Sequence, residues 1–270
     1  MNLLKKLFNF YINASIHVAL AVCSFVCVTA LYFRLEYNKS LLFFIFYATI
    51  TGYNFVKYAG VAKLYHKSLT RHLKIIQIFS LFCFLMMCFY LTKLSLQTVL
   101  FFSPFGLLTL LYAVPFFSGF KKNLRSIGYL KIIIVALVWS GITVFLPFFD
   151  TPASFSSFLY LLGLQRFLFV VVLILPFDIR DVKYDAISLQ TIPKKIGIQQ
   201  TKKVGYVLLT LCLFLEFIIT SNTNFKQVFL VVFMIILVLL MRCSEKQSTY
   251  YSSFFVESIP IIWWLLLLIT

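Results

Sequence analysis

Three of the eight acidic residues in this sequence, Asp178, Asp181 and Asp185, lie within eight positions of one another. Spacings of three and four residues place their carboxylates on one face of a helix. Like charges repel there, so the arrangement calls for a counter-charge, and a hard divalent cation such as Mg²⁺ suits a set of oxygen ligands. The spacing therefore predicts that these aspartates bind Mg²⁺, which keeps coordination positions open for the phosphate oxygens of a substrate.

Two basic neighbours offer a simpler interpretation of the same cluster. Arg180 and Lys183 could form local ion pairs with the aspartates on a solvated helix end. However, the cluster begins just after Pro176, where a long apolar run ends, and ionisable groups at such a depth usually mark a functional site. The position therefore favours the metal site.

The surrounding sequence is typical of a membrane protein. Of its 270 residues, 62% are hydrophobic and 12% charged, against roughly a quarter charged in soluble domains, and the mean hydropathy is +0.98. This composition excludes a water-soluble globular protein. The formal net charge of +16 favours membrane lipid or a phosphate-like ligand as partner, and no nucleic acid, because the basic residues lie in short loops between apolar runs.

Hydropathy windows of about 20 residues predict nine membrane-spanning helices. We expect an all-α, nine-transmembrane-helix bundle that forms a single domain over residues 1–270. The expected spans are 11–33, 41–60, 74–92, 97–117, 131–148, 156–177, 204–220, 226–242 and 253–270.

The loops between these spans differ strongly in charge. Nineteen of the 24 basic residues fall in loops on the N-terminal side and four on the opposite side. By the positive-inside rule, we expect a multi-pass protein of the cytoplasmic (inner) membrane with its N-terminus in the cytoplasm.

Several passages together resemble the UbiA superfamily of intramembrane prenyltransferases. Residues 177–185, FDIRDVKYD, followed by Thr191, Pro193 and Gly197, are similar to the second aspartate-rich motif of that family. Two further passages resemble it as well: 111–115, LYAVP, followed by a basic loop and Lys131, and 250–257, which ends in Glu257. The resemblance implies a nine-helix UbiA-like fold and Mg²⁺-assisted transfer of a prenyl group from a prenyl diphosphate to an acceptor that the sequence does not identify.

The first aspartate motif of the family has no counterpart here. Its position resembles residues 52–58, where Asn54 remains but every aspartate is missing, and no acidic residue lies between Glu36 and Asp150. Our hypothesis is that a single Mg²⁺ remains, bound by Asp178, Asp181 and Asp185 as the catalytic residues, and that lysines contact the diphosphate directly. The candidate substrate-binding residues are Asn54, Lys57, Tyr112, Lys121, Lys122, Arg125 and Arg180.

Two other classes of function stay open. The missing motif is compatible with a catalytically silent relative that binds an isoprenoid lipid or a membrane partner. A transporter would need polar groups through the membrane. Apart from basic residues within four positions of a span end, the only charged residues inside the predicted spans are Arg166, Glu216 and Glu257. Arg166 either pairs with Glu216 or lines a ligand pocket, and Glu257 either faces the mouth of a cavity or snorkels to the membrane surface.

Overall fold

The computed structural model describes residues 3–36, 38–64, 71–114, 124, 127–151, 155–183 and 191–270. Over these residues the protein consists of helices and connecting turns, without β-strands, so the expected all-α class is confirmed. The helices are α1 (Leu3–Asn13), α2 (Ile16–Phe33), α3 (Lys39–Leu64), α4 (Arg71–Leu91), α5 (Leu96–Ala113), α6 (Gly128–Ser140), α7 (Leu146–Phe149), α8 (Ser157–Asp181), α9 (Ile192–Ile196), α10 (Ile198–Ile219), α11 (Thr223–Arg242) and α12 (Ile259–Ile269), with π-helical turns η2 (Gly141–Phe145) and η3 (Tyr251–Val256).

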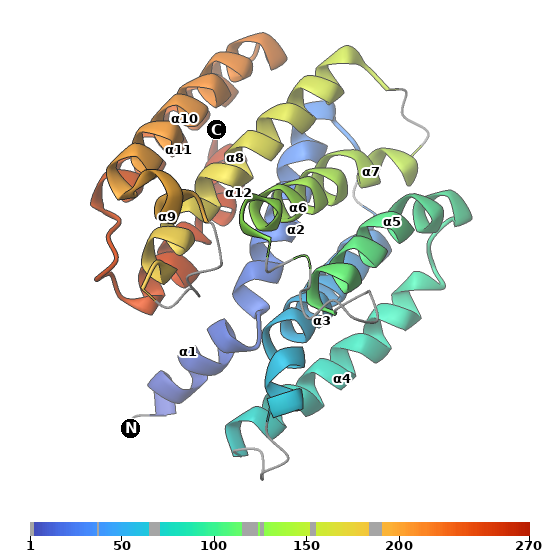
Figure 1. The fold of residues 1–270 in the computed structure, drawn as a ribbon. Coiled ribbons are helices and arrows are strands. Elements are labelled where there is room, and N and C mark those ends of the chain that lie inside the picture. The colour runs from blue at the N-terminus through green and yellow to red at the C-terminus, as the bar shows by residue number, and fades with distance from the viewer. Residues whose placement is uncertain are drawn as a thin grey trace.

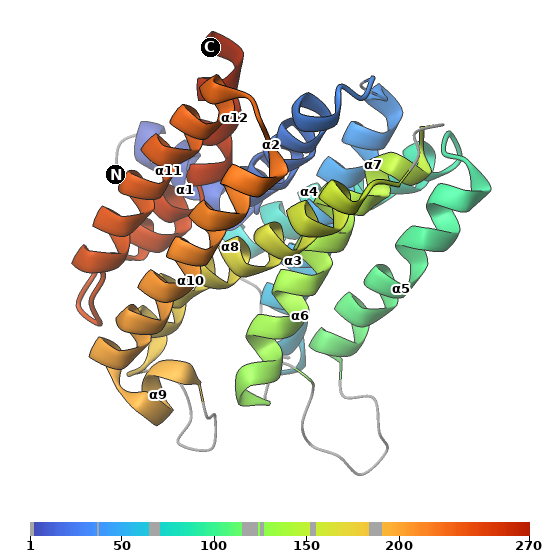
Figure 2. The ribbon, with the colours of Figure 1, turned by 90° about the horizontal axis from the view of Figure 1, so that it is seen from above.

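Helix α8 occupies the middle of the bundle. It packs against α6 and α10, while α2 packs between α3 and α12, and α3 contacts α4 and α5. Figure 1 shows α10 and α11 on one side and α3, α4 and α5 on the other, and Figure 2 shows the same division from above. Figure 2 also shows that the C-terminal ends of α3, α5 and α8 and the N-terminal end of α6 lie at the same end of the bundle.

The apolar residues divide between a core and an outer surface. Phe25, Phe169 and Trp263 are fully buried in the main core, whereas large side chains such as Ile78 of α4 and Phe214 of α10 are 70% and 65% exposed. Apolar outer faces of this kind suit a lipid environment. The protein is thus a multi-pass membrane protein.

Seven helical segments among the described residues are long and apolar enough to cross a membrane. Helices α3 and α10, of 26 and 22 residues, are also long enough but are not among the seven. The count of nine spans therefore stays a prediction. The sixth expected span, 156–177, is extended in the structure to Asp181, so that Asp178 and Asp181 belong to the last turn of α8.

The first expected span, 11–33, was predicted as one continuous helix, and this is wrong. The structure divides it, because α1 ends at Asn13 and α2 begins at Ile16. At the break Ser15 adopts a left-handed conformation with φ of 62°. The side chain of Asn54 on α3 stabilises this break, since its Nδ2 donates to the carbonyl of Ala14 at 3.2 Å and its Oδ1 accepts from the Ser15 hydroxyl at 2.8 Å. Hydropathy does not encode such a contact.

A glycine allows α8 to approach η2 closely. A Cβ atom at Gly163 would lie 2.6 Å from the ring of Phe145, and the carbonyl of Gly163 accepts a hydrogen bond from Ser140 at 2.7 Å. The missing side chain therefore sets the distance between α8 and the α6–η2 segment.

We expect Gly163→Ala to destabilise the protein by about 1–3 kcal/mol, because the added methyl group overpacks a site closed by an aromatic ring. Gly52→Ala is the matched control, since a Cβ atom there meets its nearest neighbour, Thr109, at an ordinary 3.5 Å. Thermal unfolding in detergent measures both variants. Equal melting temperatures would contradict the assignment of Gly163 as a close-packing position.

Candidate functional site

Asp178 is fully buried in the last turn of α8 and forms an ion pair with a residue of the neighbouring helix. The ammonium of Lys131, in the first turn of α6, lies 2.7 Å from Asp178 Oδ1, and the side chain of Lys131 is only 17% exposed. A buried carboxylate needs such a partner because its transfer out of water is costly. The pair therefore ties the end of α8 to the start of α6.

Asp181, one turn further along, has a cationic partner on its own helix. Arg180 donates from Nε to Asp181 Oδ1 at 2.7 Å and from a terminal nitrogen to Oδ2 at 3.1 Å, and its guanidinium lies 5.4 Å from the ring centre of Phe177. The second terminal nitrogen, NH1, reaches the carbonyl of Thr249 at a long 3.5 Å. The simpler sequence interpretation, local ion pairing, thus describes the Arg180–Asp181 pair as it stands.

The segment 245–258 packs against this end of α8. Gln247 Nε2 donates to the carbonyl of Pro176 at 2.7 Å, and the Ser252 hydroxyl donates to the same carbonyl at 3.4 Å. The passage 250–257, singled out by sequence, therefore lies beside the acidic residues of α8.

Several predicted site residues lie outside the described residues. These are Asp185, Lys121, Lys122 and Arg125. Tyr112 is described and is buried near the end of α5. The motif residues Thr191 and Pro193 start the short helix α9, and Gly197 follows it with φ of 81°, a left-handed value that favours glycine.

Asn54 and Lys57 lie on α3, near the end that faces the site. The amide of Asn54 is buried and also donates to the Ser80 hydroxyl on α4 at 2.8 Å, so this side chain holds α1, α2, α3 and α4 together. Lys57 is exposed, and its ammonium donates to the Ser15 hydroxyl at 2.9 Å. Substrate binding by either residue stays a prediction, and the contacts give Asn54 a structural role.

The sequence analysis named no charged partner for Glu257, and in the structure two basic residues lie close enough to interact with it. Its half-buried carboxylate interacts electrostatically with Lys57 of α3 and Arg180 of α8. The two sequence interpretations, a position at the mouth of a cavity and snorkelling to the membrane surface, both stay predictions. No local spacing pointed to this arrangement, because the three residues are far apart in the chain.

Arg166 and Glu216 form a second buried polar cluster, deeper in the bundle. The guanidinium of Arg166 lies 3.9 Å from the ring centre of Phe25 and donates to that residue's carbonyl at 3.2 Å. Glu216 instead accepts from Tyr32 and, at 2.8 Å, from Gln165. Arg166 and Glu216 interact electrostatically, but the structure records no direct ion pair between them, so the simple pairing expected from sequence is indirect.

The donor set at the end of α8 fits Mg²⁺ in type, because Asp178 and Asp181 offer carboxylate oxygens three residues apart. Within the described residues no group of three or more His, Cys, Asp or Glu side chains gathers as a metal site. The third predicted ligand, Asp185, lies outside those residues. Both described aspartates also have a cationic partner, so a metal ion would have to share them with Lys131 and Arg180.

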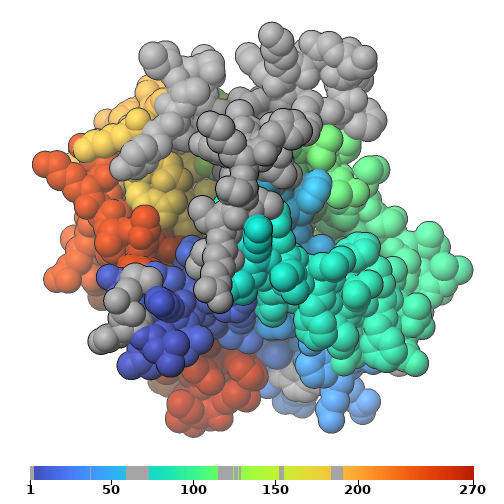
Figure 3. All heavy atoms as spheres, turned by 90° about the horizontal axis from the view of Figure 1, so that it is seen from below, coloured from blue at the N-terminus to red at the C-terminus, as the bar shows by residue number. Residues whose placement is uncertain are grey.

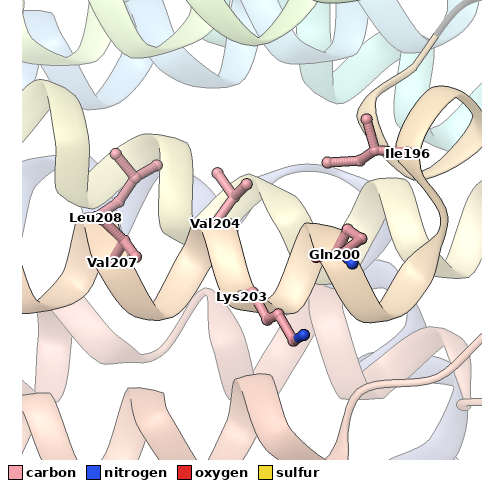
Figure 4. Close-up of a pocket in the computed structure, with 6 residues that line it drawn as sticks. All are labelled: Ile196, Gln200, Lys203, Val204, Val207 and Leu208. Carbon is pink, nitrogen blue, oxygen red and sulfur yellow. The ribbon is translucent and has the colours of Figure 1, made fainter.

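A groove on the described surface lies elsewhere. It has a volume of about 500 Å³ on the outer face of α9 and α10. Figure 4 shows its lining residues, which are Ile196, Gln200, Lys203, Val204, Val207 and Leu208. None of them is an acidic or motif residue, and apolar side chains dominate. The groove therefore adds no chemistry to the site at the end of α8.

Comparison with known proteins identifies the fold. Neither the protein-family models nor the curated proteins contain a match to this chain. Among solved structures, the apo structure of a UbiA homolog from Aeropyrum pernix K1 is similar with a TM-score of 0.67 and 13% identity, over 94% of this chain and 98% of that one.

Two further structures agree. One, described as a digeranylgeranylglyceryl phosphate synthase in membranes, has a TM-score of 0.61 and 13% identity over 98% of both chains. The other, a UbiA homolog from Archaeoglobus fulgidus bound to GPP and Mg²⁺, has a TM-score of 0.56 and 11% identity over 94% of both chains. The chain has the fold of these UbiA homologues, as the sequence resemblance predicted.

We expect Lys131→Met to destabilise the protein by about 3–5 kcal/mol, because it leaves the buried carboxylate of Asp178 without its ion-pair partner. Lys183→Met is the matched control, since Lys183 lies 3.8 Å from Glu245 in an exposed pair, which is worth at most about 1 kcal/mol. Thermal and denaturant unfolding in detergent measure the difference. A similar small effect of both substitutions would contradict the importance of the Lys131–Asp178 pair.

Proposed function

We propose that residues 1–270 form one integral membrane domain that transfers a prenyl group from a prenyl diphosphate to an acceptor. The observation that carries the proposal is the meeting of Asp178, Asp181, Lys131 and Arg180 at one end of a UbiA-like bundle. Carboxylates that suit a divalent cation and cations that suit phosphate oxygens are both needed to bind a metal-complexed diphosphate.

In this proposal the acidic residues bind the metal ion and the basic residues bind phosphate oxygens. Asp178, Asp181 and Asp185 would hold one Mg²⁺, which when bound supplies positive charge to the leaving diphosphate. Lys131 and Arg180 already lie against the two described carboxylates, where they can turn toward phosphate oxygens. Direct phosphate contacts in place of the missing first motif would come from Lys57, Lys121, Lys122 and Arg125. Tyr112 and Asn54 complete the proposed set of substrate-binding residues.

The prenyl chain of the donor would lie within the membrane-embedded part of the protein. The apolar bundle around α8 suits a prenyl chain, and the basic loops suit a cytoplasmic location for the diphosphate, with the N-terminus inside and the protein in the inner membrane. The partners of the site are then a prenyl diphosphate and membrane lipid.

One observation favours a second candidate, a catalytically silent isoprenoid-binding protein. Asp178 and Asp181 each have a protein cation as partner, so these two carboxylates are balanced without a metal ion. A protein that only holds an isoprenoid lipid or a membrane partner needs no more than this.

Mg²⁺-dependent release of diphosphate separates the two candidates. With geranyl, farnesyl and geranylgeranyl diphosphates as donors, we expect release or tight binding by the wild-type protein in nanodiscs. Asp181→Asn should lower Mg²⁺-dependent binding by about tenfold to hundredfold, the loss typical of a weakened metal site. The matched control is Asp150→Asn, because Asp150 accepts from Thr98 at 3.1 Å in the connection between α7 and α8, away from the site.

An equal loss in both variants would assign the effect to folding. Unchanged Mg²⁺-dependent binding in Asp181→Asn would contradict the metal site. Neither release nor binding with any donor, in folded wild-type protein, would favour the silent candidate.

A further inference from the structure

The charged side chains near the end of α8 continue across the bundle to α3. Asp181 pairs with Arg180, Arg180 and Lys57 both interact with Glu257, and Lys57 donates to Ser15 at the break between α1 and α2. The charges alternate along this line, from carboxylate to guanidinium to carboxylate to ammonium. It joins the second aspartate motif to the helix where the first motif is missing.

Glu257 reaches this position through an irregular helix. The π-helical turn η3 ends at Val256, and the backbone N–H of Glu257 donates to the carbonyl of Ser252, five residues earlier, at 3.2 Å. The additional residue in such a turn rotates everything that follows it around the helix axis, and π-helical turns are frequent at functional sites. In a regular α-helix the carboxylate of Glu257 would point in a different direction around the helix axis.

The described cluster balances its charge without any ligand. Lys57, Lys131 and Arg180 carry three positive charges, and Asp178, Asp181 and Glu257 carry three negative ones. The carboxylates of Asp178 and Asp181 have direct ion pairs. Glu257 has no ion pair within 4.0 Å among the described residues, so it attracts Lys57 and Arg180 across a longer distance.

Both cations attracted by Glu257 keep room for another anion. Among the described residues, Lys57 is exposed with the Ser15 hydroxyl as its hydrogen-bond partner, and Arg180 NH1 makes a long contact of 3.5 Å with the carbonyl of Thr249. A diphosphate binds lysine and arginine through charge-assisted hydrogen bonds. It would also be repelled by a neighbouring carboxylate, which carries the same sign of charge.

We propose that Glu257 is the resident counter-anion of Lys57 and Arg180, and that the diphosphate group of a prenyl donor competes with it for these two cations. This inference rests on the proposed function for the identity of the ligand. It assigns Glu257 a role that the sequence could not: the residue keeps the pair of cations in place in the free protein and lowers their affinity for anions.

The test measures the binding of inorganic diphosphate and of geranyl diphosphate, each with and without Mg²⁺, by calorimetry in nanodiscs. Glu257→Gln removes the charge and keeps the shape, so we expect affinity for both ligands to rise by about threefold to tenfold, as removal of a nearby like charge predicts. A purely structural role of Glu257 would instead weaken binding. Glu245→Gln, an exposed carboxylate paired with Lys183, is the matched control and should change neither affinity.

Lys57→Met and the double variant Lys57→Met/Glu257→Gln complete the comparison. Lys57→Met should weaken binding, and the gain from Glu257→Gln should be smaller in its presence, because one of the released cations is lost. Melting temperatures without ligand report on folding. If Glu257→Gln does not fold, Glu257→Asp supplies the test, because its shorter side chain draws the negative charge back from the cations and should tighten binding in the same direction.

The outcomes separate this inference from the proposed function. Tighter diphosphate binding by Glu257→Gln without any prenyl transfer would support the competition and contradict the enzyme. Prenyl transfer with unchanged or weaker binding in Glu257→Gln would contradict the competition alone. Absence of diphosphate binding in every folded variant would overturn both.

Discussion

A charge placed inside an apolar bundle has to find its partner within the protein, and this constraint organises the structure. Asp178 is fully buried, and its partner Lys131 comes from the neighbouring helix α6. Deeper in the bundle, Glu216 of α10 accepts from Tyr32 of α2 and Gln165 of α8, beside Arg166. Because a missing partner leaves a buried charge uncompensated, each cluster fixes which helices are neighbours and at what height they pack.

The sequence predicted what is encoded locally. Long apolar runs indicated the helices, and the spacing of Asp178 and Asp181 indicated their common position at one helix end, because hydropathy and helical periodicity are properties of neighbouring residues. The break at Ser15 was not predictable in this way. It depends on hydrogen bonds from Asn54, which is 39 residues further along the chain.

Residue spacing does not indicate which charged side chains of different helices interact across the bundle. Glu216 was the simplest partner for Arg166, yet the guanidinium lies on the ring of Phe25 and donates to its carbonyl, because the aromatic face and the carbonyl together replace a direct ion pair. Glu257 is a second example. Its position depends on the π-helical turn η3, which a regular helical periodicity does not anticipate, and on two cations from other helices.

Charge balance also bears on the passage of α3 whose sequence resembles the first aspartate motif of the UbiA superfamily without its acidic residues. Carboxylates around a divalent cation form a site whose negative charge is matched by a metal. Here α3 carries Lys57 in the corresponding region, and the carboxylate that faces it, Glu257, comes from the opposite end of the chain. An ammonium on a side chain is then a permanent part of the protein, whereas a metal ion is exchanged with solvent. The cation at this position is always present but weaker, because it carries one charge in place of two. In the competition proposed above, the attraction between Lys57 and Glu257 sets how much of that charge acts on a ligand.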